Sequence, residues 1–355
     1  MDLPSTSAAS LHSVSTDTNN PPCLDIEVDV EIRPNQSPTR SPVPLTSFSS
    51  PIQSPPPSIQ ETPFLLRASR ENEGFDIESS FSAHVSPPIN LPPSENSVGH
   101  EKINIVLMGE GIGRTIISSS ASIIEPVNTW PLATLSIRGK GFMAQDLTII
   151  NTANNGVAID NWAYRSVFFR CKLEGPNATL HVQGEKQFYR SSHFYGKINM
   201  VSGYAQAFFQ KCEFFGQKSY SKEKLVFSSQ SPPLSTFKSV FIFHFCAFHV
   251  VGKYSNGSET TFLGGLFGDY ASTIVMQSDL DASIAGYYFL DTSPPNTTYY
   301  AIFSNIKHGA TMKNVPSFIH TISDAEVASE YSLRVFLSGD NWIPPGVDYD
   351  LDLAK

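Results

Sequence analysis

The stretch FFRCKLEG at 168–175 returns twice further along the chain, as FYRSSHFYG at 188–196 and as FFQKCEFFG at 208–216. The phenylalanines that open the three units are spaced by twenty residues, and each unit ends on a glycine. A fixed period of this length is typical of a solenoid, in which each repeat is one coil. The repeat therefore predicts an all-β fold, a right-handed parallel β-helix, whose equivalent side chains stack about 4.8 Å apart.

The composition divides the 355-residue chain into two parts. Sixteen of its 26 prolines lie in residues 1–100, together with many serines, and such a segment lacks the apolar content to offset its ordering entropy. From residue 101 onward, short β-branched and aromatic runs alternate with Gly, Asn and Pro. We therefore expect a disordered Pro/Ser-rich segment at 1–100 and one β-helix domain at 101–355.

Charge and hydropathy argue against several classes of partner. The net charge is −9 and no basic stripe is present, which disfavours nucleic-acid binding. The longest apolar stretch, SVFIFHFCAFHVV at 239–251, is too short to cross a membrane, and the N-terminus shows no signal-peptide pattern. We expect a monomer without nucleic-acid or membrane partners, whose location the sequence leaves open.

The cysteines favour a reduced core rather than a metal site or disulfides. Cys23, Cys171, Cys212 and Cys246 include no CxxC pair, and the histidines show no metal-ligand spacing. Cys171 and Cys212 fall at matching positions two coils apart, about 10 Å, beyond the ~7 Å reach of a disulfide. Ser192 occupies the coil between them. We expect free thiols and neither a metal nor a cofactor.

The pattern changes near the C-terminus. ISDAEVASEYSLRVFL at 322–337 predicts a helix, with a capping box formed by Ser323 and Glu326 and a hydrophobic staple formed by Ile322 and Val327. Such a helix would cover the open end of the solenoid and protect unpaired strand edges.

Residues 102–353 resemble the plant pectinesterases, carbohydrate esterases that remove methyl groups from homogalacturonan. The stretches that carry the resemblance occur in the family's order and spacing. They are GFMAQDLTIINTA (141–153), VFFRCKLEG (167–175), QFYRSSHFYG (187–196), AFFQKCEFFG (207–216), TFLGGLFGDYASTIVMQSDL (261–280), PNTTYYA (295–301) and DNWIPPGVDYDLDL (340–353). The resemblance implies the same right-handed parallel β-helix, homogalacturonan as ligand and a proteinaceous pectinesterase inhibitor as partner.

The chemistry that the resemblance implies needs five side chains. An aspartate attacks the ester carbonyl, a second aspartic acid protonates the departing methanol, two glutamine amides stabilise the oxyanion, and an arginine orients the nucleophile. Here Asn199, in NMVSGYA, stands at the nucleophile position, and Ala178, in NATLH, stands at the acid position. Asn155 and Asn177 stand at the oxyanion positions, and Gly265 at the arginine position.

The substituted positions predict a family member that does not turn over pectin. The chain also lacks the Gly-x-Tyr-x-Glu signature of the family's first coil before Ile103. Phe267 and Tyr287 correspond to tryptophans that contact substrate, and with Tyr204 they are candidates for stacking on sugar rings. The same aromatic residues serve equally well for packing alone.

Two other interpretations remain open at the level of sequence. In the first, the protein is an active esterase that uses a different carboxylate, such as Glu174, Asp160 or Asp269. In the second, the chain is a decayed gene product without a stable fold.

Overall fold

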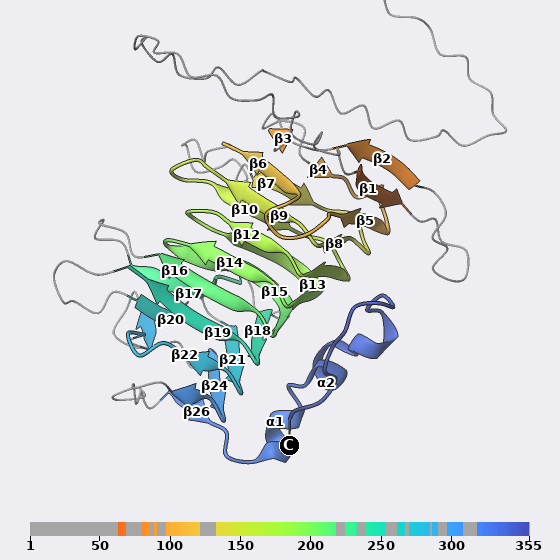
Figure 1. Cartoon of the computed structure of the whole chain (residues 1–355). Coiled ribbons are helices and arrows are strands. Elements are labelled where there is room, and N and C mark those ends of the chain that lie inside the picture. The colour runs from red at the N-terminus through yellow and green to blue at the C-terminus, as the bar shows by residue number, and fades with distance from the viewer. Residues whose placement is uncertain are drawn as a thin grey trace, which may run out of the picture. The chain divides into compact units, whose positions relative to one another are not determined.

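Three stacks of parallel strands form most of the part of the chain that the computed structural model describes (Figure 1). The described residues are 63–68, 80–84, 89–90, 97–120, 133–217, 224–232, 239–252, 261–266, 270–284, 286–289, 297–307 and 318–354. They belong to one unit, Pro56–Lys355, and a second unit, Met1–Pro55, lies outside them. Most of the predicted disordered segment, 1–100, also lies outside the described residues, and that prediction stays a prediction.

The first and second stacks belong to one sheet, because two long strands run through both. The first stack contains β4 (Ser97–Val98), β7 (Ala133–Ile137), β10 (Val157–Asn161), the first halves of β13 (Leu180–Arg190) and β15 (Asn199–Gln210), β17 (Leu225–Gln230), β20 (Thr261–Leu266) and β23 (Tyr287–Phe289). The second contains β5 (Ile105–Met108), β8 (Met143–Gln145), β11 (Ser166–Phe169), the second halves of β13 and β15, β18 (Ser239–His244), β21 (Ala271–Met276), β24 (Tyr299–Phe303) and β26 (Ile319–Thr321).

The third stack forms the other sheet. It contains β3 (Ile89–Asn90), β6 (Ile116–Ser119), β9 (Thr148–Asn151), β12 (Lys172–Glu174), β14 (His193–Gly196), β16 (Glu213–Gln217), β19 (Ala247–Val251), β22 (Asp279–Leu280) and β25 (Ile306–Lys307). Strands pair in parallel within all three stacks, while β1 (Pro63–Ala68) pairs antiparallel with β2 (Ser80–His84) and β5. The predicted parallel β-helix is confirmed.

Aromatic side chains stack along the interior, as the repeat predicted. Phe168, Tyr189, Phe209 and Phe243 form one column, with successive ring centroids 5.2, 4.7 and 4.8 Å apart. The predicted alignment needs one correction. Phe188 does pair with Phe208, but Phe168 pairs with Tyr189, so the first coil is one residue longer than the second.

A residue with left-handed backbone turns the chain between the second and third stacks in seven successive coils, from β8–β9 to β24–β25. The residue after β8, β11, β13, β15, β18, β21 and β24 has a positive φ, and none of these residues is glycine. They are Asp146, Arg170, Ser191, Lys211, Phe245, Gln277 and Ser304, with φ between 46° and 56°. This left-handed corner is costly for a residue with a side chain. We infer that pairing with the next coil on both sides holds it in place.

The predicted cysteine arrangement is observed where the structure describes it. Cys171, Cys212 and Cys246 are free and buried, and the Cys171 N–H donates to the Ser192 hydroxyl at 3.1 Å, so Ser192 does lie in the intervening coil. Burial raises the pKa of the Cys171 thiol to about 12. Cys23 lies outside the described residues.

The C-terminal helical segment is present, but its division, its cap, its staple and its position on the coils differ from the sequence expectation. It consists of two short helices, α1 (Ala325–Ser329) and α2 (Leu333–Leu337), and Asp324 rather than Ser323 accepts the capping hydrogen bond, from the Glu326 N–H. Val327 is exposed, so it forms no staple. The buried residues of the segment pack against Phe188, Phe208 and other outer side chains of the second stack, on the flank of the coils (Figure 1).

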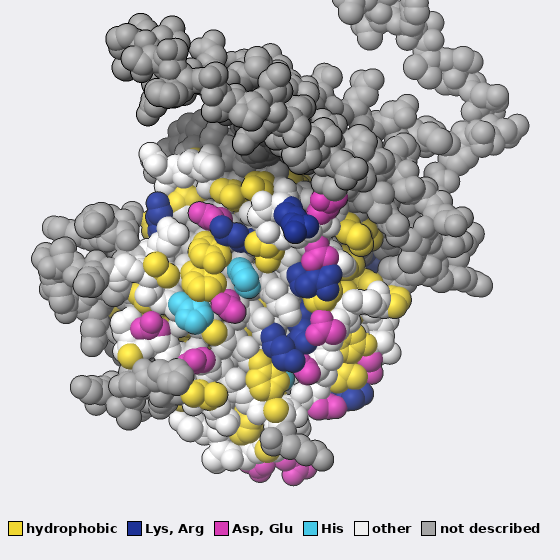
Figure 2. Space-filling model, viewed as in Figure 1, with side chains coloured by type: hydrophobic (Ala, Val, Ile, Leu, Met, Phe, Trp, Pro, Cys, Tyr) yellow, Lys and Arg dark blue, Asp and Glu magenta, His cyan; other side chains and the backbone are white. Residues whose placement is uncertain are grey.

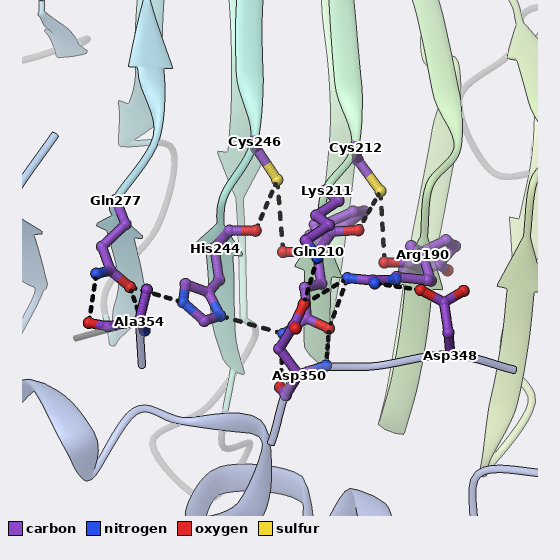
Figure 3. A network of polar contacts seen from close by, with 12 residues as sticks. Arg190, Gln210, Lys211, Cys212, His244, Cys246, Gln277, Asp348, Asp350 and Ala354 are labelled. Atoms are coloured by element: carbon purple, nitrogen blue, oxygen red, sulfur yellow. Dashed lines mark hydrogen bonds and ion pairs between the residues drawn. The ribbon is translucent and has the colours of Figure 1, made fainter. Parts of the chain in front are cut away.

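The chain beyond these helices is held to the corners of the coils by polar contacts (Figure 3). Arg190, with 3% of its side chain exposed, pairs with Asp348 and Asp350, and Lys211 also pairs with Asp350. The Gln210 amide donates to the Asp350 carbonyl at 2.7 Å. These contacts fasten residues 348–354 to strands far earlier in the sequence.

Among the described residues, no helix is long and apolar enough to cross a membrane.

Candidate functional site

Three asparagines on successive coils form a ladder of side-chain amides. Asn155 precedes β10, Asn177 precedes β13, and Asn199 opens β15. The Asn199 Nδ2 donates to Asn177 Oδ1, and the Asn177 Nδ2 donates to Asn155 Oδ1, each at 3.4 Å. We call these residues the amide ladder. The structure thus brings together three positions that the sequence assigned to the family's nucleophile and oxyanion groups.

The ladder is neutral and its hydrogen bonds are long. A distance of 3.4 Å lies near the upper limit for an N–H···O bond, so these contacts are weak and can yield to a ligand. A carboxamide both donates and accepts hydrogen bonds, but it does not supply the anionic oxygen that attacks an ester. Ala178, at the predicted acid position, is buried and carries no proton donor.

A second row of polar residues crosses the first stack beside the ladder. Register places Ser136, Asp160, His181, Ser202, Ser229 and Gly265 opposite one another on β7, β10, β13, β15, β17 and β20. Their neighbours in sequence, such as Ile159, Leu180 and Val201, belong to the interior core. Because side chains alternate along a strand, this row faces outward. Gly265, at the predicted arginine position, is therefore on this outer face.

Asp160 is the charged centre of the row. Its carboxylate is 0% exposed and receives three contacts: from Arg138 Nη2 at 2.7 Å, from His181 Nδ1 at 2.7 Å and from Trp162 Nε1 at 3.0 Å. Burial works to raise the pKa of Asp160, but the hydrogen bonds and charges of His181 and Arg138 outweigh it and lower the pKa. Asp160 is therefore ionised and accepts from three side-chain donors.

Arg138 and Trp162 complete one side of this cluster. The Arg138 guanidinium lies over the Trp162 ring, 4.6 Å from its centroid, while its Nη2 bonds Asp160. Stacking and the ion pair together fix the orientation of the arginine. A guanidinium thus lies on the outer face although Gly265 carries none.

His181 and Gln183 complete the other side. Because the ionised Asp160 accepts from His181 Nδ1, that nitrogen carries a proton, and the ring presents Nε2 toward Gln183 Nε2, 3.4 Å away. Gln183 is only 4% exposed, yet its Oε1 has no hydrogen-bond partner among the described residues. We call Arg138, Asp160, Trp162, His181 and Gln183 the Asp160 cluster.

The structure describes the side chain of only one of the three aromatic residues that the sequence proposes for sugar stacking. Tyr204 is the register partner of Gln183 and is partly exposed, so it lies next to the Asp160 cluster. Tyr287 opens β23, and only its backbone is described. Phe267 and Asp269 lie outside the described residues.

Glu174 lies elsewhere, on the third stack. Its carboxylate is 2.8 Å from Lys172 Nζ, and the same ammonium lies 4.5 Å from the Tyr195 ring centroid. Figure 2 shows the face on which the third stack lies, where acidic and basic side chains are interspersed. Glu174 is therefore separate from the outward row of the first stack.

Sequence reasoning missed most of the Asp160 cluster. Arg138, Trp162 and Gln183 were not singled out, and His181 was noted only as one of several histidines without metal-ligand spacing. A usable signal existed, because Asp160, His181 and Ser202 are 21 residues apart each time. Because residues one coil period apart occupy equivalent positions, this spacing places the three side chains next to one another on successive coils.

The comparisons with known proteins agree with this fold. A sequence profile of the pectinesterase family matches residues 94–340. The chain therefore belongs to the pectinesterase family.

Two plant proteins of this family are similar in sequence to this chain. The chain is 31% identical over 252 residues to pectinesterase 2 of Citrus sinensis, covering 68% of this chain and 49% of that protein. It is 30% identical over 253 residues to the probable pectinesterase/pectinesterase inhibitor 46 of Arabidopsis thaliana, covering 68% of this chain and 44% of that protein. The chain thus spans about half the length of these relatives.

A solved structure supports the fold. The pectin methylesterase from carrot superposes with a TM-score of 0.64 at 23% identity, covering 72% of this chain and 84% of that one. A pectin methylesterase mutant in complex with a hexasaccharide superposes with a TM-score of 0.56 at 18% identity, covering 73% and 86%. At these identities the likeness concerns the fold.

Proposed function

We infer that this protein is a non-catalytic member of the pectinesterase family that binds homogalacturonan through the outer face of its first stack. The observation that carries this proposal is the amide ladder: the positions assigned to nucleophile and oxyanion groups hold three asparagines, each hydrogen-bonded to the next. Removing a nucleophile alone forfeits several powers of ten in rate.

The surroundings support binding without turnover. Ala178 offers no acid for the leaving methanol, and Gly265 offers no guanidinium to orient a nucleophile. The outer face nevertheless carries amides, a stacked arginine and Tyr204, which are the groups that hold sugar hydroxyls and rings. A pectin methylesterase mutant with the same fold forms a complex with a hexasaccharide, which supports a sugar ligand for this fold.

The proposal is tested by two measurements on the purified protein. Highly methylated pectin should release no methanol above the uncatalysed rate, whereas calorimetric titration with homogalacturonan oligomers should give saturable binding. Methanol release that survives mutation of Asn199 would contradict the first part, and absence of binding would contradict the second.

The alternative of an active esterase draws on the remaining carboxylates. Asp160 is buried and already accepts from three donors, which makes it a poor nucleophile, and Glu174 is paired with Lys172 on another stack. Turnover that survives Asn199→Ala but is lost in Asp160→Asn, Glu174→Gln or Asp269→Asn would favour this alternative.

The alternative of a decayed product is tested by folding. The proposal expects a cooperative β-type melt in circular dichroism, because the interior columns pack continuously from coil to coil. A protein without a cooperative melt would favour the decayed product. An inhibitor protein as partner is likewise a proposal, prompted by relatives whose names join pectinesterase with pectinesterase inhibitor.

A further inference from the structure

Two glutamines hold the last described residues of the chain at the corner between the second and third stacks (Figure 3). Gln210 ends β15, and its Nε2 donates to the Asp350 carbonyl at 2.7 Å while its Oε1 accepts from the Asp350 N–H at 2.9 Å. Gln277, just after β21, makes the same pair of contacts with Ala354, at 3.1 and 3.3 Å. Each glutamine thus binds the backbone of one residue through both of its polar atoms. We call residues 348–354 the C-terminal clasp.

His244 lies between the two glutamines and is buried. Gln210 Nε2 is 3.2 Å from its Nδ1, and Gln277 Oε1 is 3.0 Å from its Nε2. A backbone N–H only donates and a backbone carbonyl only accepts, so the clasp fixes which atom of each glutamine faces the ring. Gln210 therefore presents a donor to the ring, and Gln277 presents an acceptor. The closed clasp matches the neutral ring that carries its proton on Nε2.

A second proton on the ring conflicts with the closed clasp. Protonated histidine donates from both nitrogens, so its Nδ1–H would point at the Gln210 NH₂ group, which is also a donor. Turning the Gln210 amide over would present Oε1 to the ring. The NH₂ group would then face the Asp350 N–H and Arg190 Nη1, which donate to Oε1 in the closed clasp. Either the ring or the clasp therefore loses hydrogen bonds when His244 is charged.

The charged groups that face His244 come from three parts of the chain. Burial lowers the pKa of His244, whereas the hydrogen bond to Gln277 and the charge of Asp350 act to raise it. The cations of Arg190 on β13 and Lys211 after β15 act to lower the pKa further. Opening the clasp lets water reach the ring, so its pKa returns toward the ordinary value of about 6.5. The open clasp therefore binds the proton more readily than the closed one.

The coils next to the clasp are held together by other contacts. The second half of β15 pairs in parallel with β18, and β18 pairs with β21. In the interior, the rings of Phe209 and Phe243 stack with centroids 4.8 Å apart. Neither the strand pairing nor the ring stacking involves a group that titrates near neutral pH. Protonation of His244 therefore acts on the clasp before it acts on the coils.

We propose that the C-terminal clasp is a pH-sensitive strap, closed on neutral His244 and released from intact coils when the ring takes up a second proton. The closed state is fully favoured above about pH 6.5, and its ratio to the open state falls by up to about tenfold per pH unit as pH decreases toward the lowered pKa. Release separates Arg190 and Lys211 from Asp350. The proposal is independent of sugar binding, because the clasp contacts the second stack and its corner rather than the first stack.

The experiment measures backbone amide hydrogen exchange by NMR in the full chain, between about pH 7.5 and 5. The amides of Asp350 and Ala354 report the clasp, since Gln210 and Gln277 accept from them. Their protection factors, corrected for the intrinsic exchange rate at each pH, should fall by up to about tenfold per pH unit below about pH 6.5. The amides of β18 report the coils and should keep their protection.

His244→Gln is the test variant, because an amide can donate to Gln277 and accept from Gln210 without titrating. Its clasp should keep the same protection across the whole pH range. His249→Gln is the matched control, since it makes the same change at a half-exposed position on the third stack, and it should behave as the wild type. The ring resonances of His244 in the wild type provide a check without substitution. Their titration midpoint should coincide with the midpoint of the loss of clasp protection.

The outcomes decide the proposal. Clasp protection that falls with pH in the wild type and in His249→Gln, but stays constant in His244→Gln, supports it. Clasp protection that does not change with pH in the wild type overturns it, as does a fall that persists in His244→Gln. Loss of protection in β18 together with the clasp would show unfolding of the coils and would overturn release of the clasp alone. A His244 titration midpoint apart from the loss of protection also overturns it.

Discussion

Arg190 Nη1 lies 2.9 Å from the Asp350 carboxylate, which joins two residues 160 positions apart in the sequence. Arg190 ends β13 and is almost fully buried, while Asp350 follows the last helices and is partly exposed. The ion pair also gives Asp350 a depressed pKa: burial acts to raise it, and the bonds to Lys211 and Arg190 outweigh burial. The C-terminal segment is thus part of the folded core rather than an appendage.

Arg190→Leu should lower the free energy of unfolding by about 1.5–3 kcal/mol, because it removes the hydrogen bonds that the buried guanidinium donates to the charged carboxylates of Asp348 and Asp350. The measurement is chemical denaturation followed by circular dichroism. Arg334→Leu is the control, since Arg334 pairs with Asp352 at an exposed position of the same segment and should change little. Equal losses of stability in both variants would show that the buried ion pairs of Arg190 stabilise the protein no more than an exposed pair does.

His244 should make stability fall as pH decreases from about 6.5. Burial lowers its pKa, and Gln210 and Gln277 contact its two ring nitrogens at 3.2 and 3.0 Å, which satisfies the neutral ring. The unfolded chain therefore binds the proton more readily, so the stability present above about pH 6.5 is lost as pH falls through the lowered pKa. Denaturation midpoints between about pH 7.5 and 5 measure the effect.

His244→Gln should flatten this pH dependence, because an amide can donate to Gln277 and accept from Gln210 without titrating. His249→Gln is the control at a half-exposed position on the third stack and should leave the slope unchanged. A slope that persists in His244→Gln would assign the effect to another group.

Phe209→Ala should lower the free energy of unfolding by about 3–5 kcal/mol, because the ring is fully buried between Tyr189 and Phe243. Phe215→Ala removes the same ring from the outer side of the third stack, where it stacks on Tyr195 and His249 and is partly exposed. Thermal melting should show a clearly smaller loss for this outer position. Similar losses of stability in the two variants would mean that the interior column stabilises the fold no more than the outer one.

Asn199→Asp alone should not generate measurable methanol release from methylated pectin. The restored carboxylate would still lack an acid at Ala178 and a guanidinium at Gly265, and groups that act as a unit are not additive in catalysis. The triple variant with Ala178→Asp and Gly265→Arg is the informative comparison. Turnover by the single variant would show that the remaining surroundings suffice.

Much of the fold was predictable because one local signal repeats. The aromatic units at 168–216 specify coils of nearly equal length, and the parallel stacks follow from them. The alignment of Phe168 was predicted wrongly because register depends on the corners, where one extra residue shifts a whole coil. The helix at 322–337 was predicted as continuous because its apolar spacing persists through residues 330–332, where the backbone turns instead.

The candidate site was predictable only in part. Motif correspondence located Asn155, Asn177 and Asn199, and the structure places their amides in contact. Arg138 and Gln183 carried no such signal, because an outward polar residue on a strand looks the same whether it faces solvent or a buried carboxylate. Their partners come from adjacent coils, so the cluster exists only after the coils are stacked.

Residues 348–354 contact Arg190, Gln210 and Gln277, and these contacts set the order in which the parts of the chain can fold during synthesis. Coils can close one after another as they emerge, since each needs only its predecessor, but this clasp forms only after every coil has been synthesised. A chain that ends before Asp348 would leave the buried Arg190 guanidinium without the two carboxylates that neutralise it.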